Sequence, residues 1–225
     1  MLDRRAFLAG AAGLAMSACA DESDFSLIAA DDDTPPLIPP EGEGRVAVRG
    51  GEIWYRVAGS GPGAPLLVVH GGPGFSHDYL LPLEALARDR AVIFYDQLDC
   101  GKSDKPGAPT NWQVPRFVDE IRALSTSLGL NRYHLLGHSW GGLLAAEFAA
   151  IDSRRLLSCI LASPLISAPQ WMSDNLRWRK LLPVAVRQVL DENEAAGTVR
   201  GAAYQQAAQA FYRRHLCRME PWPEP

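Results

Sequence analysis

The sequence predicts an α/β protein with a mostly parallel sheet and helices on both of its faces. Two observations support this fold class. Short, continuous apolar runs, typical of strands buried on both sides, alternate with longer segments of helical periodicity. In addition, three glycine-containing polar motifs each directly follow one of the apolar runs. Because ligands of such sheets bind beyond the carboxyl ends of the strands, the three motifs are expected to share one site.

The predicted sheet opens with a β-hairpin, because residues 45–48 and 52–57 alternate between apolar and polar types around Gly50-Gly51. Short apolar runs predict four further strands, at residues 65–70, 91–95, 133–136 and 157–162. Helical stripes predict three helices between those strands, at residues 79–88, 117–128 and 143–150. Beyond Ala162 the pattern indicates helices alone, at residues 176–190 and 198–216.

Length and composition are those of a folded domain with a sizeable core. The chain has 225 residues, of which 47% are hydrophobic and 21% are charged. Its formal net charge of −4 gives no reason to expect binding to nucleic acid or to an acidic membrane surface. The four cysteines lack the paired spacing of zinc ligands, and Cys159 fits a buried free thiol. No histidines cluster with acids, so neither a metal nor another cofactor is expected.

The first 19 residues have the order of an export signal. Arg4-Arg5 precedes a short apolar stretch, and small residues lead to Cys19. The twin arginine resembles a Tat signal, and the residues before Cys19 resemble a lipobox, in which the cysteine is lipidated. A short buried helix is the alternative interpretation. Residues 20–44 are rich in proline, glycine and acids and are predicted to be a disordered tether. We therefore expect an exported, periplasmic or envelope lipoprotein that contacts a membrane only through Cys19.

The motif with the clearest chemistry is Gly137-His138-Ser139-Trp140-Gly141, which lies between a predicted strand and a predicted helix. A Gly-x-Ser-x-Gly sequence in that setting forms a sharp turn that exposes the serine hydroxyl above the sheet. Ser139 is therefore the predicted nucleophile. The backbone amide of Trp140, at the start of the helix, can donate to a developing oxyanion. An ordinary glycine-rich turn between strand and helix is the alternative.

Two loops accompany the nucleophile. His70-Gly71-Gly72-Pro73-Gly74 follows a strand at the position that supplies the second oxyanion amide, and Gly72 is the predicted donor. We interpret His70 as a structural histidine that shapes this loop, since the catalytic histidine of this fold follows the serine in chain order. Residues 96–104 form a polar loop near the site, and the same chain order argues against Asp96 as the catalytic acid.

Residues 45–225 together resemble the proline iminopeptidase group of α/β-hydrolase serine peptidases. The resemblance rests on His70–Gly74, Asp96-Gln97-Leu98 with Cys100-Gly101 and Ser103-Asp104, and Gly137–Gly142. Phe211-Tyr212, His215–Arg218 and Pro221-Trp222-Pro223 resemble part of that family's helical cap. The implied layout is a hydrolase core at 45–167 and an incomplete cap at 168–225. The implied activity is release of an N-terminal residue, typically proline, from short peptides through an acyl-enzyme on Ser139, with Gly72 and Trp140 as oxyanion donors.

Two departures from the family pattern matter. Asp99 stands where the family usually has glycine, and aspartate tolerates a positive φ less well than glycine. In addition, the fold should supply an acid and a histidine after Ser139, yet no later strand or Gly-His turn follows Ala162. We therefore expect a C-terminally truncated chain that lacks the triad Asp and His. An aminopeptidase fragment, an inactive product, and an esterase or amidase on the same fold stay open, as does the oligomeric state.

Overall fold

A computed structural model describes residues 34–222 of the chain. The predicted signal peptide, the lipidation site Cys19 and most of the predicted tether lie outside the described residues. The chain divides between Ile166 and Ser167 into two compact units, which we call the core unit and the helical unit. This division lies one residue from the expected boundary. No helix among residues 34–222 has both the length and the apolar character needed to span a bilayer.

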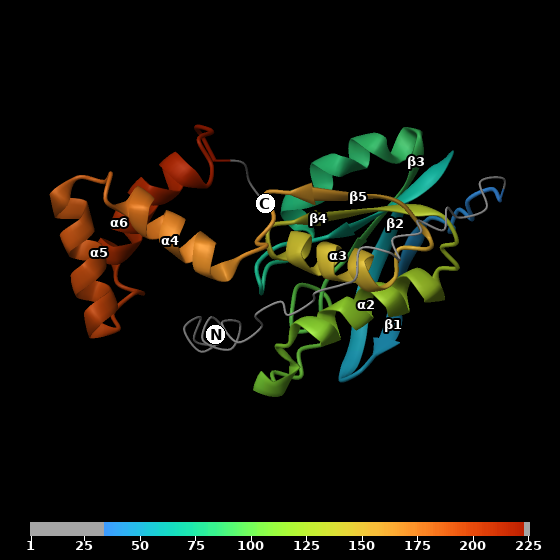
Figure 1. The fold of residues 1–225 in the computed structure, drawn as a ribbon, viewed down its shortest axis with the longest axis horizontal. Coiled ribbons are helices and arrows are strands. Elements are labelled where there is room, and N and C mark those ends of the chain that lie inside the picture. The colour runs from blue at the N-terminus through green and yellow to red at the C-terminus, as the bar shows by residue number, and fades with distance from the viewer. Residues whose placement is uncertain (1–33, 223–225) are drawn as a thin grey trace, which may run out of the picture. The chain divides into compact units, whose positions relative to one another are not determined.

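The core unit is built on a five-stranded sheet (Figure 1). The strand order is β1-β2-β4-β5, and β3 also pairs with β2. The β1–β2 pair is antiparallel, whereas β2 with β4 and β4 with β5 are parallel. The strands are β1 (Gly42–Val48), β2 (Gly51–Val69), β3 (Arg90–Tyr95), β4 (Tyr133–His138) and β5 (Leu156–Ala162). The predicted α/β class with a mostly parallel sheet is confirmed.

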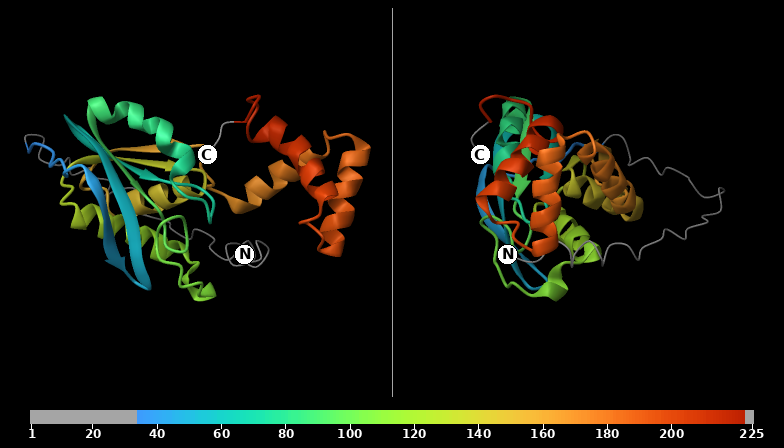
Figure 2. Two further views of the ribbon diagram at one scale, coloured as in Figure 1. Left: turned by 180° about the vertical axis from the view of Figure 1, so that it is seen from behind. Right: turned by 90° about the vertical axis from the view of Figure 1, so that its left-hand side faces the viewer.

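Strand β2 is one long strand where the sequence predicted two. Its first half pairs with β1 along the hairpin and with β3 in antiparallel register from Tyr55 to Ala58. Register shifts then interrupt the pairing. Beyond them, Leu66 to Val68 of β2 pair with Val92 to Phe94 of β3, and both segments run in the same chain direction. Strand β3 therefore lies between the two halves of β2, and the second half continues into the parallel part of the sheet. The first half of β2 runs beside β1 (Figure 2).

Helices cover both faces of the sheet, and the alternation of side chains along the strands explains why. Leu67 and Ile93 point to one face, where they pack with α2 (Val114–Ser127) and α3 (Trp140–Ile151). Their neighbours in the strands point to the other face, where they pack against residues of η1 (Asp78–Arg88). The element η1 is a 3₁₀ helix, not the predicted α-helix, and Pro82 inside it removes a backbone donor.

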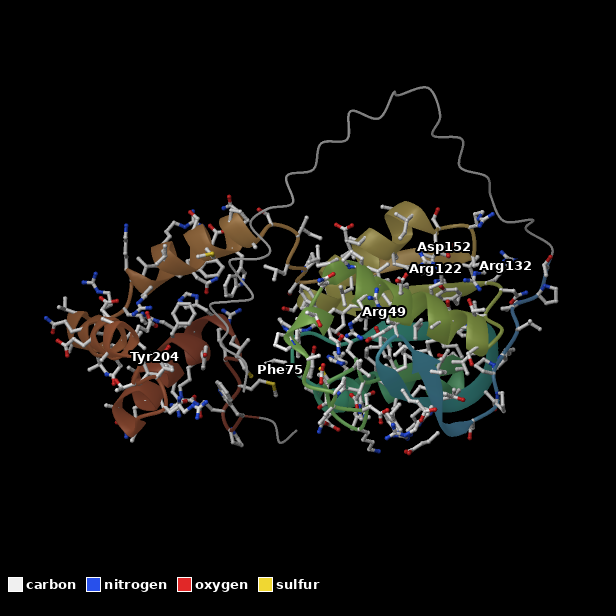
Figure 3. All side chains as sticks on the ribbon, turned by 90° about the horizontal axis from the view of Figure 1, so that it is seen from below. Arg49, Phe75, Arg122, Arg132, Asp152 and Tyr204 are labelled. Atoms are coloured by element: carbon white, nitrogen blue, oxygen red, sulfur yellow. The ribbon has the colours of Figure 1, made fainter. Side chains whose placement is uncertain are left out.

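The two helices of one face are also joined by charge. Arg122 of α2 and Asp152, which follows α3, lie 3.5 Å apart between guanidinium Nε and carboxylate Oδ2, and Figure 3 shows them side by side. A second 3₁₀ helix, η2 (Pro109–Asn111), precedes α2. The edge strand β5 keeps three large apolar side chains exposed in this unit, namely Leu157, Ile160 and Leu161.

The predicted tether ends earlier than residue 44. Strand β1 begins at Gly42, because its backbone pairs with β2 up to Val57. Residues before it are also held. The amide of Leu37 donates to Asn131 Oδ1 at 2.6 Å, and the side chain of Arg132 donates to the carbonyl of Thr34 at 2.9 Å. Polar groups of the two residues just before β4 thus bind the segment that composition alone assigned to disorder.

The helical unit contains α4 (Ala168–Arg179), α5 (Val184–Ala196) and α6 (Ala202–His215). The predicted helix at 176–190 is wrong, because Pro183 interrupts the pattern and becomes the N-cap of α5. A small apolar cluster joins α5, α6 and the loop between α4 and α5, and it includes Leu182, Leu190 and Ala208. Arg179 of α4 binds both oxygens of Glu194, and the hydroxyl of Tyr204 donates to the same carboxylate.

Candidate active site

Ser139 is the single residue between the end of β4 and the start of α3. Its backbone has φ 54° and ψ −116°, a conformation that costs a non-glycine residue of the order of 1–3 kcal/mol. The two glycines of the motif make room for this turn. A Cβ on Gly137 would lie 2.1 Å from the carbonyl oxygen of Gly141, and a Cβ on Gly141 would lie 2.2 Å from that of Val69. The predicted sharp turn with an unusual serine backbone is therefore present.

Backbone hydrogen bonds hold the strained serine in place. The amide of Ser139 donates to Ala162 of β5 at 2.9 Å, and its carbonyl accepts from Gly142 and Leu165, both at 2.9 Å. Three segments of the core unit therefore fix the position of one residue, which is the support that a strained backbone requires. Trp140 is the first residue of α3, so its backbone N–H is one of the first-turn donors that have no hydrogen-bond partner within the helix.

The glycine loop that follows β2 packs directly on this turn. A Cβ on Gly71 would lie 3.1 Å from Ser139 Cβ and 3.0 Å from the carbonyl oxygen of His138. Gly72 has φ 129° and Gly74 has φ 94°, values that favour glycine. The structure thus brings the predicted oxyanion loop and the predicted nucleophile into contact.

His70 is fully buried and has a defined tautomer. Its Nε2 accepts the backbone N–H of Gln97 at 3.0 Å, so Nδ1 carries the proton and donates to the carbonyl of Gly71 at 2.8 Å. Burial lowers the pKa of His70 to about 4, and the ring is therefore neutral at physiological pH. These contacts tie His70 to the glycine loop and to Gln97, and His70 has no hydrogen bond to the Ser139 hydroxyl.

Gln97 connects the three motifs, although it was not among the predicted site residues. Its side-chain amide donates to the backbone carbonyl of His70 at 2.8 Å. Its side-chain oxygen accepts the indole N–H of Trp140 at 3.0 Å. A buried glutamine in the second loop therefore joins the glycine loop to the residue that follows the nucleophile. In the sequence, Gln97 stood out only as a member of the polar loop that follows the strand ending at Tyr95.

Asp96 organises the second loop. Its carboxylate accepts from the ring Nδ1 of His77 at 2.9 Å and from the amides of His77 and Lys102, both at 2.8 Å. Burial would raise the pKa of Asp96, but these hydrogen bonds outweigh it and lower the pKa. Asp99 in the same loop has φ 68°, so the backbone does require the region that favours glycine, and its carboxylate accepts from the amide of Gly107 at 2.7 Å.

The other histidines of the core unit also have partners away from the nucleophile. His134 hydrogen-bonds Ser158 at 2.8 Å, and His138 hydrogen-bonds Tyr79 at 2.8 Å. In the helical unit, His215 stacks on Trp178 with ring centroids 5.2 Å apart. Among residues 34–222, no histidine is hydrogen-bonded to the Ser139 hydroxyl. That part of the chain also holds no cluster of three or more metal-ligating side chains.

Comparison with known proteins agrees with this geometry. Residues 64–221 match the α/β hydrolase fold family. The proline iminopeptidase of Heyndrickxia coagulans is 42% identical over 183 residues, and that of Saccharolobus solfataricus is 36% identical over 173 residues. These alignments cover 81% and 76% of this chain, but 64% and 55% of the two relatives. The chain therefore spans less than two thirds of their length.

Solved structures give the same result. The crystal structure of the proline iminopeptidase of Mycobacterium smegmatis is 42% identical, has a TM-score of 0.72, and is matched over 64% of its length by 81% of this chain. The crystal structure of VinJ is 38% identical, with a TM-score of 0.79, and 83% of this chain matches 65% of it. The nucleophile turn, the glycine loop and these matches together show that the chain belongs to the α/β-hydrolase fold family and is similar to its proline iminopeptidases.

Proposed function

We propose that the protein is a serine aminopeptidase of the proline iminopeptidase type, which releases an N-terminal residue, typically proline, from short peptides. The observation that carries this proposal is the contact between the strained Ser139 turn and the glycine loop at Gly71, in a chain 42% identical to a proline iminopeptidase. A serine held in this way can attack a carbonyl while nearby amides receive the oxyanion.

In the proposed reaction, the Ser139 hydroxyl attacks the carbonyl carbon of the N-terminal residue while a histidine base takes its proton. The backbone amides of Gly72 and Trp140 donate to the oxyanion of the tetrahedral intermediate. Collapse expels the amine of the shortened peptide, which takes the proton back from the histidine, and leaves an acyl-enzyme. Water then attacks the ester and releases the free amino acid. Substrate binding needs no cofactor in this scheme.

None of the described histidines supplies the base that takes the Ser139 proton, because each of them has other contacts. We therefore keep two alternatives from the sequence. One is a chain that binds but does not turn over, since loss of triad members costs several orders of magnitude in rate. The other is an esterase or amidase on the same fold, because the fold does not fix the substrate.

One set of assays separates these three functions. The purified 225-residue chain is given a proline arylamide, an alanine arylamide and a p-nitrophenyl ester, and Ser139 is probed with a fluorophosphonate. Turnover of the proline arylamide, abolished in Ser139→Ala and kept in the exposed control Ser127→Ala, supports the aminopeptidase. Turnover of the ester alone would overturn the peptidase assignment. A folded chain that neither turns over substrate nor takes up the probe would support the non-catalytic alternative.

We further propose that the protein is an exported lipoprotein anchored through Cys19. The support is the sequence alone: Arg4-Arg5, a short apolar stretch and small residues before the cysteine. An alkyne-palmitate label is expected on the wild type and not on Cys19→Ser, with Cys217→Ser as the matched control. A wild type that takes up no label in a host with lipoprotein processing would refute the anchor.

A further inference from the structure

Tyr79, on the 3₁₀ helix η1, binds the glycine loop and the nucleophile turn with one hydroxyl. The backbone N–H of Gly71 donates to Tyr79 Oη at 2.7 Å. The same oxygen lies 2.8 Å from Nδ1 of His138, the residue before the nucleophile. The sequence pattern had placed Tyr79 at the start of a predicted helix and had given it no role in the site.

The direction of the hydrogen bond between Gly71 and Tyr79 follows from the chemistry of the groups. A backbone amide can only donate, so Tyr79 Oη accepts from Gly71. The direction of the second hydrogen bond depends on the tautomer of His138, and we assign the tautomer in which Nδ1 is unprotonated and accepts the single hydroxyl proton. Burial lowers the pKa of His138 and raises the pKa of Tyr79, so both groups are in the protonation states that this arrangement needs. The hydroxyl therefore accepts on one side and donates on the other.

Packing around the hydroxyl shows how tightly the three segments meet. A Cβ on Gly71 would lie 2.9 Å from Tyr79 Oη, in addition to its close approach to Ser139 Cβ. The rings of Tyr79 and His138 meet edge to face with centroids 5.3 Å apart. Phe75, which is labelled in Figure 3, also meets the Tyr79 ring edge to face, with centroids 6.0 Å apart. The ring thus contacts a residue from each of the two segments that its hydroxyl joins.

We propose that Tyr79 is a positioning residue, whose hydroxyl fixes the glycine loop relative to the Ser139 turn. The proposal rests on the function proposed above, in which the amide of Gly72 stabilises the oxyanion. The hydrogen bond to Tyr79 holds the backbone N–H of Gly71, one peptide before the amide of Gly72, and so restrains the loop from which that amide donates. Oxyanion donors are effective because they are held in place before the charge develops, and a free loop would lose this advantage. Tyr79 itself does not touch the reacting atoms.

The variant Tyr79→Phe removes the hydroxyl and keeps the ring. Titration of His138 by NMR is the first measurement, because the Tyr79 proton stabilises the neutral imidazole. We expect the pKa of His138 to rise in Tyr79→Phe, together with faster hydrogen exchange at the Gly71 amide. Fluorophosphonate labelling of Ser139 should slow about tenfold, because a less restrained Gly72 amide donates a weaker hydrogen bond to the oxyanion. The control Tyr204→Phe loses a hydroxyl in the helical unit and should leave all three unchanged.

The possible outcomes separate this proposal from the proposed function. An unchanged His138 titration and unchanged Gly71 exchange would overturn the hydrogen-bonded bridge. Changes in both with normal labelling of Ser139 would overturn the positioning role. If the wild type takes up no probe, the proposed function fails for this chain. Hydrogen exchange at the Gly72 amide then tests the positioning role of Tyr79 by itself, and an exchange rate that is not faster in Tyr79→Phe would overturn that role. The second variant His138→Phe removes the acceptor. Because the two groups act as one unit, the double variant should be no slower than either single variant.

Discussion

Replacing His70 with glutamine should make the stability of the core unit less dependent on pH. The reason is that His70 is fully buried and its pKa is lowered to about 4, against 6.5 for a histidine in water. Below pH 6.5 the unfolded chain binds a proton at this position that the folded chain does not bind until about pH 4. The unfolded state therefore gains stability as the pH falls, and the folded protein becomes less stable.

The size of the effect follows from the two pKa values. They differ by about 2.5, and each pKa unit corresponds to about 1.36 kcal/mol, so the full contribution of His70 is about 3 kcal/mol. Between pH 7.5 and pH 5 the linkage equation gives a loss of about 2 kcal/mol. Glutamine does not titrate, and its side-chain oxygen can still accept from the backbone N–H of Gln97, which donates to His70 in the wild type. The variant should therefore lack this loss, whatever its stability at pH 7.5.

Urea unfolding followed by tryptophan fluorescence at a series of pH values measures the difference. Wild type and His70→Gln share their other titrating groups, including His134 and His138, so the contributions of those groups cancel in the comparison. The expected result is a free energy of unfolding that falls about 2 kcal/mol less in the variant between pH 7.5 and pH 5. Parallel curves for the two proteins would refute the assignment of His70 as a buried neutral histidine.

Three further predictions concern packing, backbone and surface. Gly142→Ala should lower the free energy of unfolding by about 1–3 kcal/mol, because the new Cβ would lie 2.7 Å from the Cβ of Pro164. This is expected even though alanine favours helices more than glycine does, and a variant that is more stable in urea would contradict it. Asp99→Val should be less stable than the matched Asp99→Gly by about 1–2 kcal/mol because φ is 68°, and equal urea midpoints would argue against it. Ile160→Lys should raise the concentration at which the chain aggregates, since this β5 side chain is 43% exposed; unchanged light scattering would speak against an edge-driven association.

Much of the core unit could be predicted from local patterns. The apolar runs at 91–95 and 157–162 became β3 and β5 with at most one residue added at an end. The boundaries failed where competing local signals met. Pro183 divided a helix that periodicity had joined, and Pro82 gave a 3₁₀ helix where an α-helix was expected. In both cases a single residue without a backbone donor outweighed an otherwise regular pattern.

The start of the core unit shows the opposite error. Residues before Gly44 have the composition of a disordered segment, and composition alone placed them in the tether. Their order depends on partners far along the chain, since Leu37 binds Asn131 and Arg132 binds Thr34. Strand pairing with β2 then orders Gly42 and Glu43. A segment with few apolar side chains can thus be held by its backbone groups, which the sequence pattern does not report.

The candidate site divides in the same way. The sequence by itself determined that Ser139 lies on a strained turn and that a glycine loop follows a buried strand, because both depend on local backbone geometry that only certain residues allow. Only the tertiary structure decided what joins them. Tyr79 lies 59 residues from His138, and Gln97 lies 43 residues from Trp140. Contacts at such separations arise when the sheet brings distant loops to one edge, and a side chain's partner is then set by the fold around it.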